Sequence, residues 1–436
     1  MRVPLRWLVG VFIVALCMIV AVAFLSAGTP SPEMDAPGVF GAPAAITDPV
    51  KRGEYLARAA DCQACHTLQG GKAYAGGRTF QLPFGTLYST NITADRINGI
   101  GTWSDEEFVR AIREGVGREG HLYPAMPYTS YTALSTADVL AIKAYLFSLP
   151  PVSQPNRVNG IGFPFNQRWG LHFWDFVFFR NQSYQVDASK DEQWNRGAYL
   201  TNALGHCGEC HTPRNIGFAM STGKYLAGAE IEGWVAANLS SEKRAGIGAW
   251  TRPQLQQYLS TGHAPGRSSA SGPMAEVVEA SLQYLSPEDV SAMATYLSTV
   301  PAQSGAEGAA VNLQRSRAID ATSGLPVQTK VKPGLGEQLF AGDCAGCHLW
   351  NGSGRQSRYA DLLGTRSVND PAGRSVIQAI LNGTHLTVAN HQEVMPSFAA
   401  RYSDSEVAEI TNYLLTLFGN TTGKVTAAQV ASQRSE

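Results

Sequence analysis

Cys62-Gln63-Ala64-Cys65-His66 is the first of three copies of a C-x-x-C-H pattern in this chain. The other two are Cys207-Gly208-Glu209-Cys210-His211 and Cys344-Ala345-Gly346-Cys347-His348, so the pattern takes up six of the seven cysteines. In this pattern the two cysteines form thioether bonds to the porphyrin of a c-type haem, and the histidine binds its iron. A thioredoxin-like pair needs no histidine after each second cysteine, and a zinc site needs a second pair of ligands.

The repeated pattern therefore predicts three covalently bound haem c groups. The cysteines that attach them are Cys62, Cys65, Cys207, Cys210, Cys344 and Cys347, and the proximal iron ligands are His66, His211 and His348. A chain of 436 residues has room for about three small domains, which agrees with one haem in each.

Each motif is followed by a methionine beside a proline, ahead of the last helix expected in its region. Met126, Met274 and Met395 lie 60, 63 and 47 residues after the three motif histidines. Methionine as the sixth ligand, opposite histidine, is typical of electron-transfer haems. The alternative is that these methionines only fill the core. Their recurrence at one position favours iron ligation by Met126, Met274 and Met395.

Four histidines near these loops are rival sixth ligands, namely His121, His263, His385 and His391. Histidines in such loops lie more often at the surface, which is where we expect these four. Met293 falls inside an expected helix and is interpreted as a core residue.

The composition excludes some classes of function. The net charge is −1 and no basic block occurs, so no nucleic-acid partner is expected. We also find no set of nucleophile and base that could carry out substrate chemistry within this chain.

The N-terminus combines Arg2 and Arg6 with an apolar run from Trp7 to Leu25. Haem attachment outside the bacterial cytoplasm requires export, and the run is about 19 residues long, which suits either a long signal peptide or a membrane-spanning helix. A cleaved signal and an uncleaved anchor both remain open. Cys17 follows Leu16 in a poor lipidation context.

The second motif region repeats the first at a period of about 145 residues. Arg52-Gly53 recurs as Arg196-Gly197 ahead of the haem motif, and the spacing of 12 residues from Asn91 to Trp103 recurs from Asn238 to Trp250. The third region is more diverged and lacks the Gly-Ile-Gly-x-Trp loop. N-cap signals at Asp48-Pro49, Ser104, Ser135, Ser286 and Ser403 predict helices, the first of which we expect to run into Cys62.

These signals predict a mainly α chain of three tandem cytochrome c-like domains with an N-terminal apolar helix. The expected segments are a signal or anchor (1–27), a tether (28–47), a first haem domain (48–150), an aromatic connector (151–190), a second haem domain (191–302), a linker (303–332), a third haem domain (333–420) and a polar tail (421–436). The connector contains no motif. It is interpreted either as packing between domains or as a docking surface for a membrane or a partner subunit.

The chain resembles the triple-haem cytochrome c subunit of membrane-bound alcohol, gluconate, fructose, sorbitol and aldehyde dehydrogenases of acetic acid bacteria and related Gram-negative bacteria. The resemblance covers about residues 50–420 and is most specific in Ser89-Thr90-Asn91-Ile92-Thr93, Leu122-Tyr123-Pro124-Ala125-Met126-Pro127-Tyr128, His206-Cys207-Gly208-Glu209-Cys210-His211-Thr212-Pro213-Arg214-Asn215 and Gly272-Pro273-Met274-Ala275-Glu276.

The resemblance implies a subunit on the periplasmic side of the inner membrane that passes electrons to ubiquinone. The electrons would come from a large catalytic subunit that carries flavin, pyrroloquinoline quinone or molybdenum, and a small third subunit is a further candidate partner. The resemblance also supports the three methionine ligands. Two alternatives are a membrane-tethered carrier that feeds a terminal oxidase and a haem enzyme such as a peroxidase, although three methionine candidates for three haems argue against an open iron site.

Overall fold

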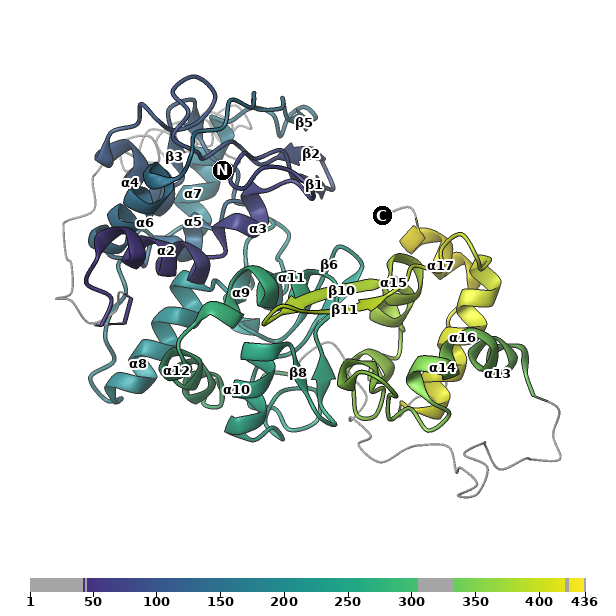
Figure 1. Ribbon diagram of the computed structural model, residues 1–436. Coiled ribbons are helices and arrows are strands. Elements are labelled where there is room, and N and C mark those ends of the chain that lie inside the picture. Colours follow the sequence, from purple (N-terminus) through teal and green to yellow (C-terminus); the bar gives the residue numbers. More distant parts are fainter. Residues whose placement is uncertain (1–41, 44, 305–332, 420–422, 435–436) are drawn as a thin grey trace, which may run out of the picture. The chain divides into compact units, whose positions relative to one another are not determined.

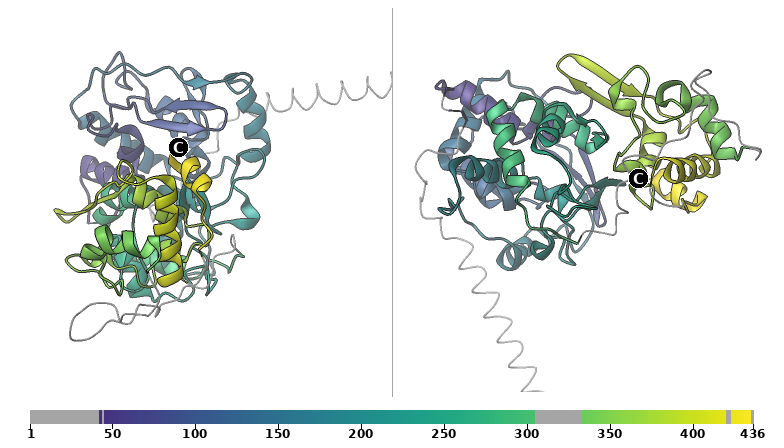
Figure 2. Two further views of the ribbon diagram at one scale, coloured as in Figure 1. Left: turned by 90° about the vertical axis from the view of Figure 1, so that its right-hand side faces the viewer. Right: turned by 90° about the horizontal axis from the view of Figure 1, so that it is seen from below.

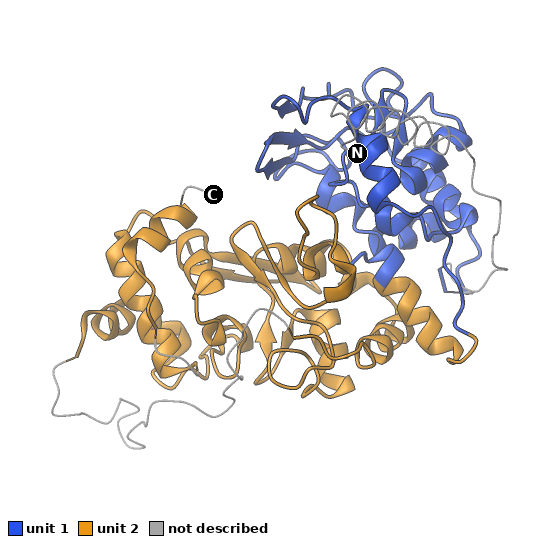
Figure 3. Ribbon diagram, turned by 180° about the vertical axis from the view of Figure 1, so that it is seen from behind, with its two compact units in different colours: residues 1–187, 202–206 blue, residues 188–201, 207–436 orange. Residues whose placement is uncertain are grey.

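The computed structural model describes residues 42–43, 45–304, 333–419 and 423–434. It confirms a largely helical chain (Figure 1), which divides into two compact units (Figure 3). Unit 1 is Met1–Asp187 with Asn202–His206, and unit 2 is Ala188–Thr201 with Cys207–Glu436. The predicted N-terminal segment 1–27 lies outside the described residues. Within the described residues, no helix combines the length and apolar character needed to cross a membrane.

Unit 1 contains the first haem motif and the connector. Its elements are α2 (Pro49–Ala59), α3 (Cys62–His66), β1 (Thr79–Leu82), β2 (Gly85–Tyr88), α4 (Asp105–Glu114), β3 (Val116–Gly117), β4 (Gly120–His121), α5 (Tyr128–Tyr131), α6 (Thr136–Ser148), β5 (Gly160–Ile161) and α7 (Gly170–Phe178). Strands β1, β2 and β5 form one antiparallel sheet, in which Thr86 pairs with Gln81 and with Gly160.

Unit 2 contains the second and third motifs. The second motif region comprises α8 (Glu192–Tyr199), η1 (Leu200–Leu204), α9 (Gly208–His211), η2 (Thr222–Lys224), β6 (Ala229–Ile231), β7 (Trp234–Ala236), α10 (Arg252–Thr261), β8 (His263–Ala264), β9 (Ser268–Ser269), α11 (Pro273–Ala280), η3 (Leu282–Tyr284) and α12 (Pro287–Leu297). Of these elements, residues 202–204 of η1 are the part that belongs to unit 1. The third comprises α13 (Leu335–Leu339), η4 (Phe340–Cys344), α14 (Ala345–His348), η5 (Arg358–Ala360), η6 (Ser367–Asn369), α15 (Arg374–Asn382), β10 (Thr384–Val388), β11 (His391–Met395), α16 (Asp404–Leu417) and α17 (Ala427–Arg434). Figure 2 shows β10 and β11 as a long paired ribbon.

A glycine allows the first and last helices of each motif region to cross at very short range. A Cβ atom on Gly53 in α2 would lie 1.9 Å from the carbonyl oxygen of Ala141 in α6. The corresponding distance is 2.0 Å for Gly197 in α8, to the carbonyl oxygen of Ala292 in α12, and 2.2 Å for Gly336 in α13, to that of Glu409 in α16. These are the last helices of the predicted haem domains 191–302 and 333–420. Because any side chain would clash there, glycine permits the contact of the two backbones.

Local capping signals position several of the longer helices. Asp48 caps α2, and Ser104 and Ser403 form capping boxes at α4 and α16, as predicted. The first helix, however, ends at Ala59 and does not run into Cys62. Asp61 adopts a left-handed conformation with φ of 52°, which breaks the helix before α3 begins.

The polar tail contains a helix that no sequence pattern above predicts. Val430 in α17 is fully buried, and Arg434 forms an ion pair with Asp404 of α16 at 2.8 Å. The core of the third region includes Phe340, Val407, Leu415 and Phe418 in addition to this valine. The tail therefore closes one side of the third region.

Candidate haem-binding sites

Each C-x-x-C-H motif ends in a short helix, respectively α3, α9 and α14. The two cysteines and the histidine of one motif therefore lie within about one helical turn of each other. None of the six motif cysteines, which all lie in the described residues, forms a disulfide. The cysteines and the histidine of each motif are thus placed to bind one ligand together.

The three motif histidines share one hydrogen-bond arrangement. Nδ1 of His66 lies 2.7 Å from the carbonyl oxygen of Thr90, Nδ1 of His211 lies 2.6 Å from that of Ala237, and Nδ1 of His348 lies 2.7 Å from that of Ala360. A carbonyl oxygen can only accept, so Nδ1 must carry the proton. The lone pair is then on Nε2, which suits iron binding, and the carbonyl also fixes the orientation of the ring.

Burial controls the protonation of the motif residues. It lowers the pKa of His66, His211 and His348, because the charged imidazolium is disfavoured away from water. Burial likewise raises the pKa of Cys62, Cys207 and Cys344 to about 12. Neutral imidazoles next to half-buried thiols in apolar surroundings suit a porphyrin that is attached covalently and held away from water.

The predicted methionine ligands occupy three different local structures. Met126 lies in the turn between β4 and α5, where its amide donates to the carbonyl of Tyr123 at 2.9 Å. Met274 is the second residue of α11, and Met395 is the last residue of β11. All three are half-buried. Met395 and Cys344 are both partly buried against the hydrophobic core of the third region.

We expected the four rival histidines to lie at the surface, and this expectation is wrong for two of them. His121 is 8% exposed, and its Nδ1 lies 2.7 Å from Oδ2 of Asp175. His263 is 2% exposed and contacts Oγ of Ser269 at 3.0 Å. His385 and His391 are exposed, as expected, and Met293 is a core residue, also as expected.

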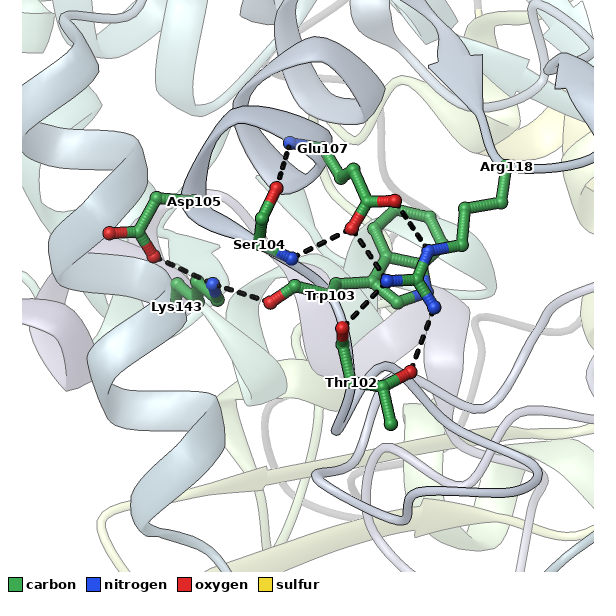
Figure 4. A network of polar contacts seen from close by, with 7 residues as sticks. All are labelled: Thr102, Trp103, Ser104, Asp105, Glu107, Arg118 and Lys143. Atoms are coloured by element: carbon green, nitrogen blue, oxygen red, sulfur yellow. Dashed lines mark hydrogen bonds and ion pairs between the residues drawn. The ribbon is translucent and has the colours of Figure 1, made fainter.

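A polar network fixes the loop that carries Trp103 (Figure 4). Arg118 donates to both carboxylate oxygens of Glu107 at 2.7 and 2.6 Å, and its guanidinium lies 5.6 Å from the centre of the Trp103 ring. The Arg118 hydrogen bonds lower the pKa of Glu107 to about 2. Lys143 of α6 donates to the carbonyl oxygen of Trp103 at 2.9 Å and thereby holds the loop on the last helix of the region.

The second region repeats this arrangement with different residues. Arg267 lies 6.0 Å from the centre of the Trp250 ring and donates to Oε1 of Gln254, which completes the capping box of α10. The repeated Asn-to-Trp spacing in the sequence therefore corresponds to a repeated fixation of the tryptophan by an arginine.

Comparisons with known proteins identify sequences that are similar to this chain. A family model described as cytochrome c matches residues 50–150 and 334–418. The chain is 38% identical over 402 residues to the fructose dehydrogenase cytochrome subunit of Gluconobacter japonicus. This alignment covers 88% of this chain and 82% of the relative. It is 39% identical over 408 residues to the gluconate 2-dehydrogenase cytochrome c subunit of Pantoea cypripedii. This second alignment covers 89% of this chain and 90% of the relative.

A third relative is the cytochrome c subunit of alcohol dehydrogenase (quinone) from Gluconobacter oxydans. It is 35% identical over 400 residues, which cover 88% of this chain and 82% of the relative. All three alignments thus extend over most of both chains and include regions that the family model does not match.

Proposed function

The chain belongs to the cytochrome c family, among the cytochrome c subunits of fructose, gluconate and alcohol dehydrogenases, and we propose that it carries electrons through three haem c groups to ubiquinone. The observation that carries this proposal is the threefold arrangement of the motif histidines, each with Nδ1 held by a main-chain carbonyl. The haem, once bound, supplies one-electron chemistry, and the protein sets its ligands and surroundings.

Three haems, and not fewer, are supported by the three helix crossings. Each motif is enclosed between a first helix and a last helix that meet at Gly53, Gly197 or Gly336. We therefore assign one haem domain to each crossing. The cysteine attachments and the histidine and methionine ligands are those predicted from the sequence.

The partner is a catalytic dehydrogenase subunit, because the relatives are named as cytochrome subunits of dehydrogenases. We propose that this partner carries flavin, pyrroloquinoline quinone or molybdenum, with a small third subunit as a further component. The word quinone in the name of the alcohol dehydrogenase relative supports a quinone as the acceptor. The apolar run from Trp7 to Leu25 supports a position on the periplasmic side of the inner membrane.

The test is to purify the chain from detergent-solubilised membranes and to determine its mass and its companions. The proposal expects a mass larger than that of the polypeptide by three haems, together with a large subunit that carries a redox cofactor. A Cys344→Ala/Cys347→Ala variant should lose one haem, whereas Cys17→Ala should lose none. A chain that elutes alone, fully loaded and still able to reduce an oxidase, would overturn the dehydrogenase assignment in favour of a tethered carrier.

A further inference from the structure

The connector helix α7 has its polar and apolar faces reversed relative to a surface helix in water. A surface helix normally buries its apolar stripe and exposes its charged residues. In α7 the aspartate is buried, while most of the aromatic side chains are exposed. Such a helix exposes apolar surface that water disfavours, which is typical of a site that contacts another apolar surface.

The inward face of α7 is attached by a buried polar cluster. Oδ2 of Asp175 lies 2.7 Å from Nδ1 of His121 in β4, and Oδ1 accepts a hydrogen bond of 2.7 Å from the hydroxyl of Tyr128 in α5. The ring of His172 lies 3.9 Å from that of His121. Because these partners are buried, the cluster fixes the rotation of α7 and holds its other face outward.

The outward face forms an aromatic patch with the loop that precedes it. The patch comprises Phe163, Phe165, Trp169, Phe173, Phe176 and Val177, all of which are exposed. Trp169 is 66% exposed and Phe173 is 51% exposed. Trp169, Phe173 and Phe176 follow helical spacing along one side, so the patch is continuous over about two turns. An isolated exposed aromatic residue would need no explanation, but this continuous set does.

The exposed charged residues in the sequence stretch that carries the patch are basic. Between residues 152 and 186 the sequence contains one acidic residue, Asp175, and this residue is buried. The basic residues in the same stretch are Arg157, Arg168 and Arg180, of which Arg157 and Arg180 are exposed. Aromatic residues flanked by arginines suit the boundary between acyl chains and anionic head groups.

We propose that the aromatic patch docks on a phospholipid bilayer, with α7 lying in the plane of the membrane surface. This inference rests on the proposed function, which places the chain at a membrane. The tether 28–47 spans at most roughly 70 Å when fully extended, and it joins the apolar N-terminal run to α2 in the same unit as α7. An anchored run would therefore keep the patch within reach of the bilayer.

The test uses the complete dehydrogenase complex in liposomes that contain anionic lipid and a photoactivatable phospholipid. After irradiation and trypsin digestion, the peptide Trp169–Arg180, which lies between two arginines, should carry the lipid label. Peptides that contain Ile97 or Ile216 provide the control, because these two residues are apolar and more exposed than any residue of the patch. We expect at least fivefold more label on Trp169–Arg180 than on either control peptide.

A matched pair of variants identifies the face responsible. Phe173→Ser/Phe176→Ser should lower the labelling of this peptide about tenfold, because each phenylalanine loses apolar burial. Phe173→Leu/Phe176→Leu should retain it. The haem absorption spectrum checks that both variants fold.

Two results would overturn the docking. One is an unlabelled Trp169–Arg180 peptide in a complex that still transfers electrons from its substrate. The other is labelling that appears only after the catalytic subunit has been removed, which would assign the patch to that subunit. Neither result contradicts the proposed electron-transfer function. That function would be refuted if the chain purified without any dehydrogenase subunit, whether or not the Trp169–Arg180 peptide is labelled.

Discussion

Each motif histidine is oriented by a main-chain carbonyl that lies 12 to 26 residues further along the chain. A main-chain acceptor cannot be removed by a side-chain substitution, so the tautomer required for iron binding depends on the course of the backbone alone. That backbone is in turn fixed by loop residues. In the first region Gly76 has a positive φ, and a Cβ there would lie 2.4 Å from the carbonyl carbon of Thr90.

At the residue scale, His263 should make stability depend on pH. Burial, followed by the positive charge of Arg358, lowers the pKa of His263 to about 4, although Glu393 opposes this shift. Tyr359, whose ring lies 5.1 Å away, and Ser269 complete its surroundings. As the pH falls below about 6.5, the unfolded chain binds a proton that the folded chain excludes until about pH 4. The contribution of the neutral His263 to the free energy of unfolding is therefore fully present above pH 6.5. It is lost as the pH falls from 6.5 to about 4.

The measurement is the thermal midpoint of the wild type and of His263→Gln over that pH range. Carboxylates also titrate near its lower end, so the informative quantity is the difference between the two proteins. The wild type should lose more stability than the variant as the pH falls. Parallel curves would show that His263 does not contribute to the pH dependence.

The buried carboxylate of α7 provides a second prediction at the residue scale. In Asp175→Asn, an amide NH₂ group would face either the His121 donor or the Tyr128 hydroxyl, so one buried hydrogen bond is lost. We expect the free energy of local opening of α7 to fall by about 1–3 kcal/mol. Hydrogen exchange of residues 170–178 measures this change.

The control for that prediction is Asp105→Asn. Asp105 pairs with Lys143 at 2.7 Å, but its side chain is 73% exposed. Water can replace the lost contact there, so the effect on α4 should stay below about 1 kcal/mol. Equal effects of the two substitutions would contradict the structural role of Asp175.

The two buried histidines also show what the sequence could not predict at this scale. The C-x-x-C-H motifs are local patterns, so the haem attachment residues could be predicted from the sequence alone. The burial of His121 depends on Asp175, which lies 54 residues away, and that of His263 includes Tyr359 from another region. Neither contact leaves a local signal, so both histidines were interpreted as surface residues.

At the scale of elements, the glycine crossings predict a sharp contrast between two positions in the third region. In Gly336→Ala the new methyl group would lie 2.2 Å from the carbonyl oxygen of Glu409, so α13 and α16 must move apart. We expect a loss of at least about 3 kcal/mol in unfolding free energy, comparable to overpacking in a core. Gly342 has nothing within 4 Å, so Gly342→Ala should change stability by less than about 1 kcal/mol.

The measurement is chemical denaturation of both variants, followed by haem absorption, together with the yield of haem-loaded chain. A Gly336→Ala protein with the stability of Gly342→Ala would show that the crossing tolerates a side chain. The three crossings would then be a weak argument for three equivalent haem domains.

Helix starts were predictable because a cap is a local hydrogen bond. Ser104, Ser135, Ser286 and Ser403 each accept from the amide three residues on, as their sequence pattern indicates. The connector was not predictable in the same way. The direction in which α7 faces depends on partners in β4 and α5, and periodicity alone cannot say which face of a helix is buried.

At the scale of the whole molecule, unit 2 joins its two motif regions through the elements that carry the predicted distal ligands. Helix α11, which contains Met274, faces the hairpin that ends at Met395. Gln283 donates to the carbonyl oxygen of Thr387 at 2.9 Å, and Glu279 accepts from the Thr387 amide at 3.0 Å. These contacts connect the segments that carry the predicted ligands Met274 and Met395. If both proposed haems are bound, this connection suits direct electron transfer between them.

The junction between the second and third motif regions, formed by these contacts, also contains a half-buried guanidinium. This group should hold the two regions together even when the chain between them is cut. Arg366 of the third region donates to the carbonyl oxygens of Ala245 and Gly246 in the second. Burial lowers its pKa to about 10, so it stays charged at neutral pH. A protease site introduced into 305–332, outside the described residues, allows the connection to be cut in the folded protein.

After cleavage, size-exclusion chromatography should show residues 333–436 still bound in the wild type. Arg366→Ala removes two hydrogen bonds from a charged donor, which contribute about 1–3 kcal/mol each. The released fraction should therefore correspond to at least tenfold weaker association. Arg374→Ala is the matched control, because the pair of Arg374 with Glu230 at 2.8 Å is largely exposed and contributes little. If the wild-type fragments separate at micromolar concentration, the junction is too weak to couple the second and third proposed haem sites. If both variants release the fragment equally, the half-buried guanidinium does not hold the junction.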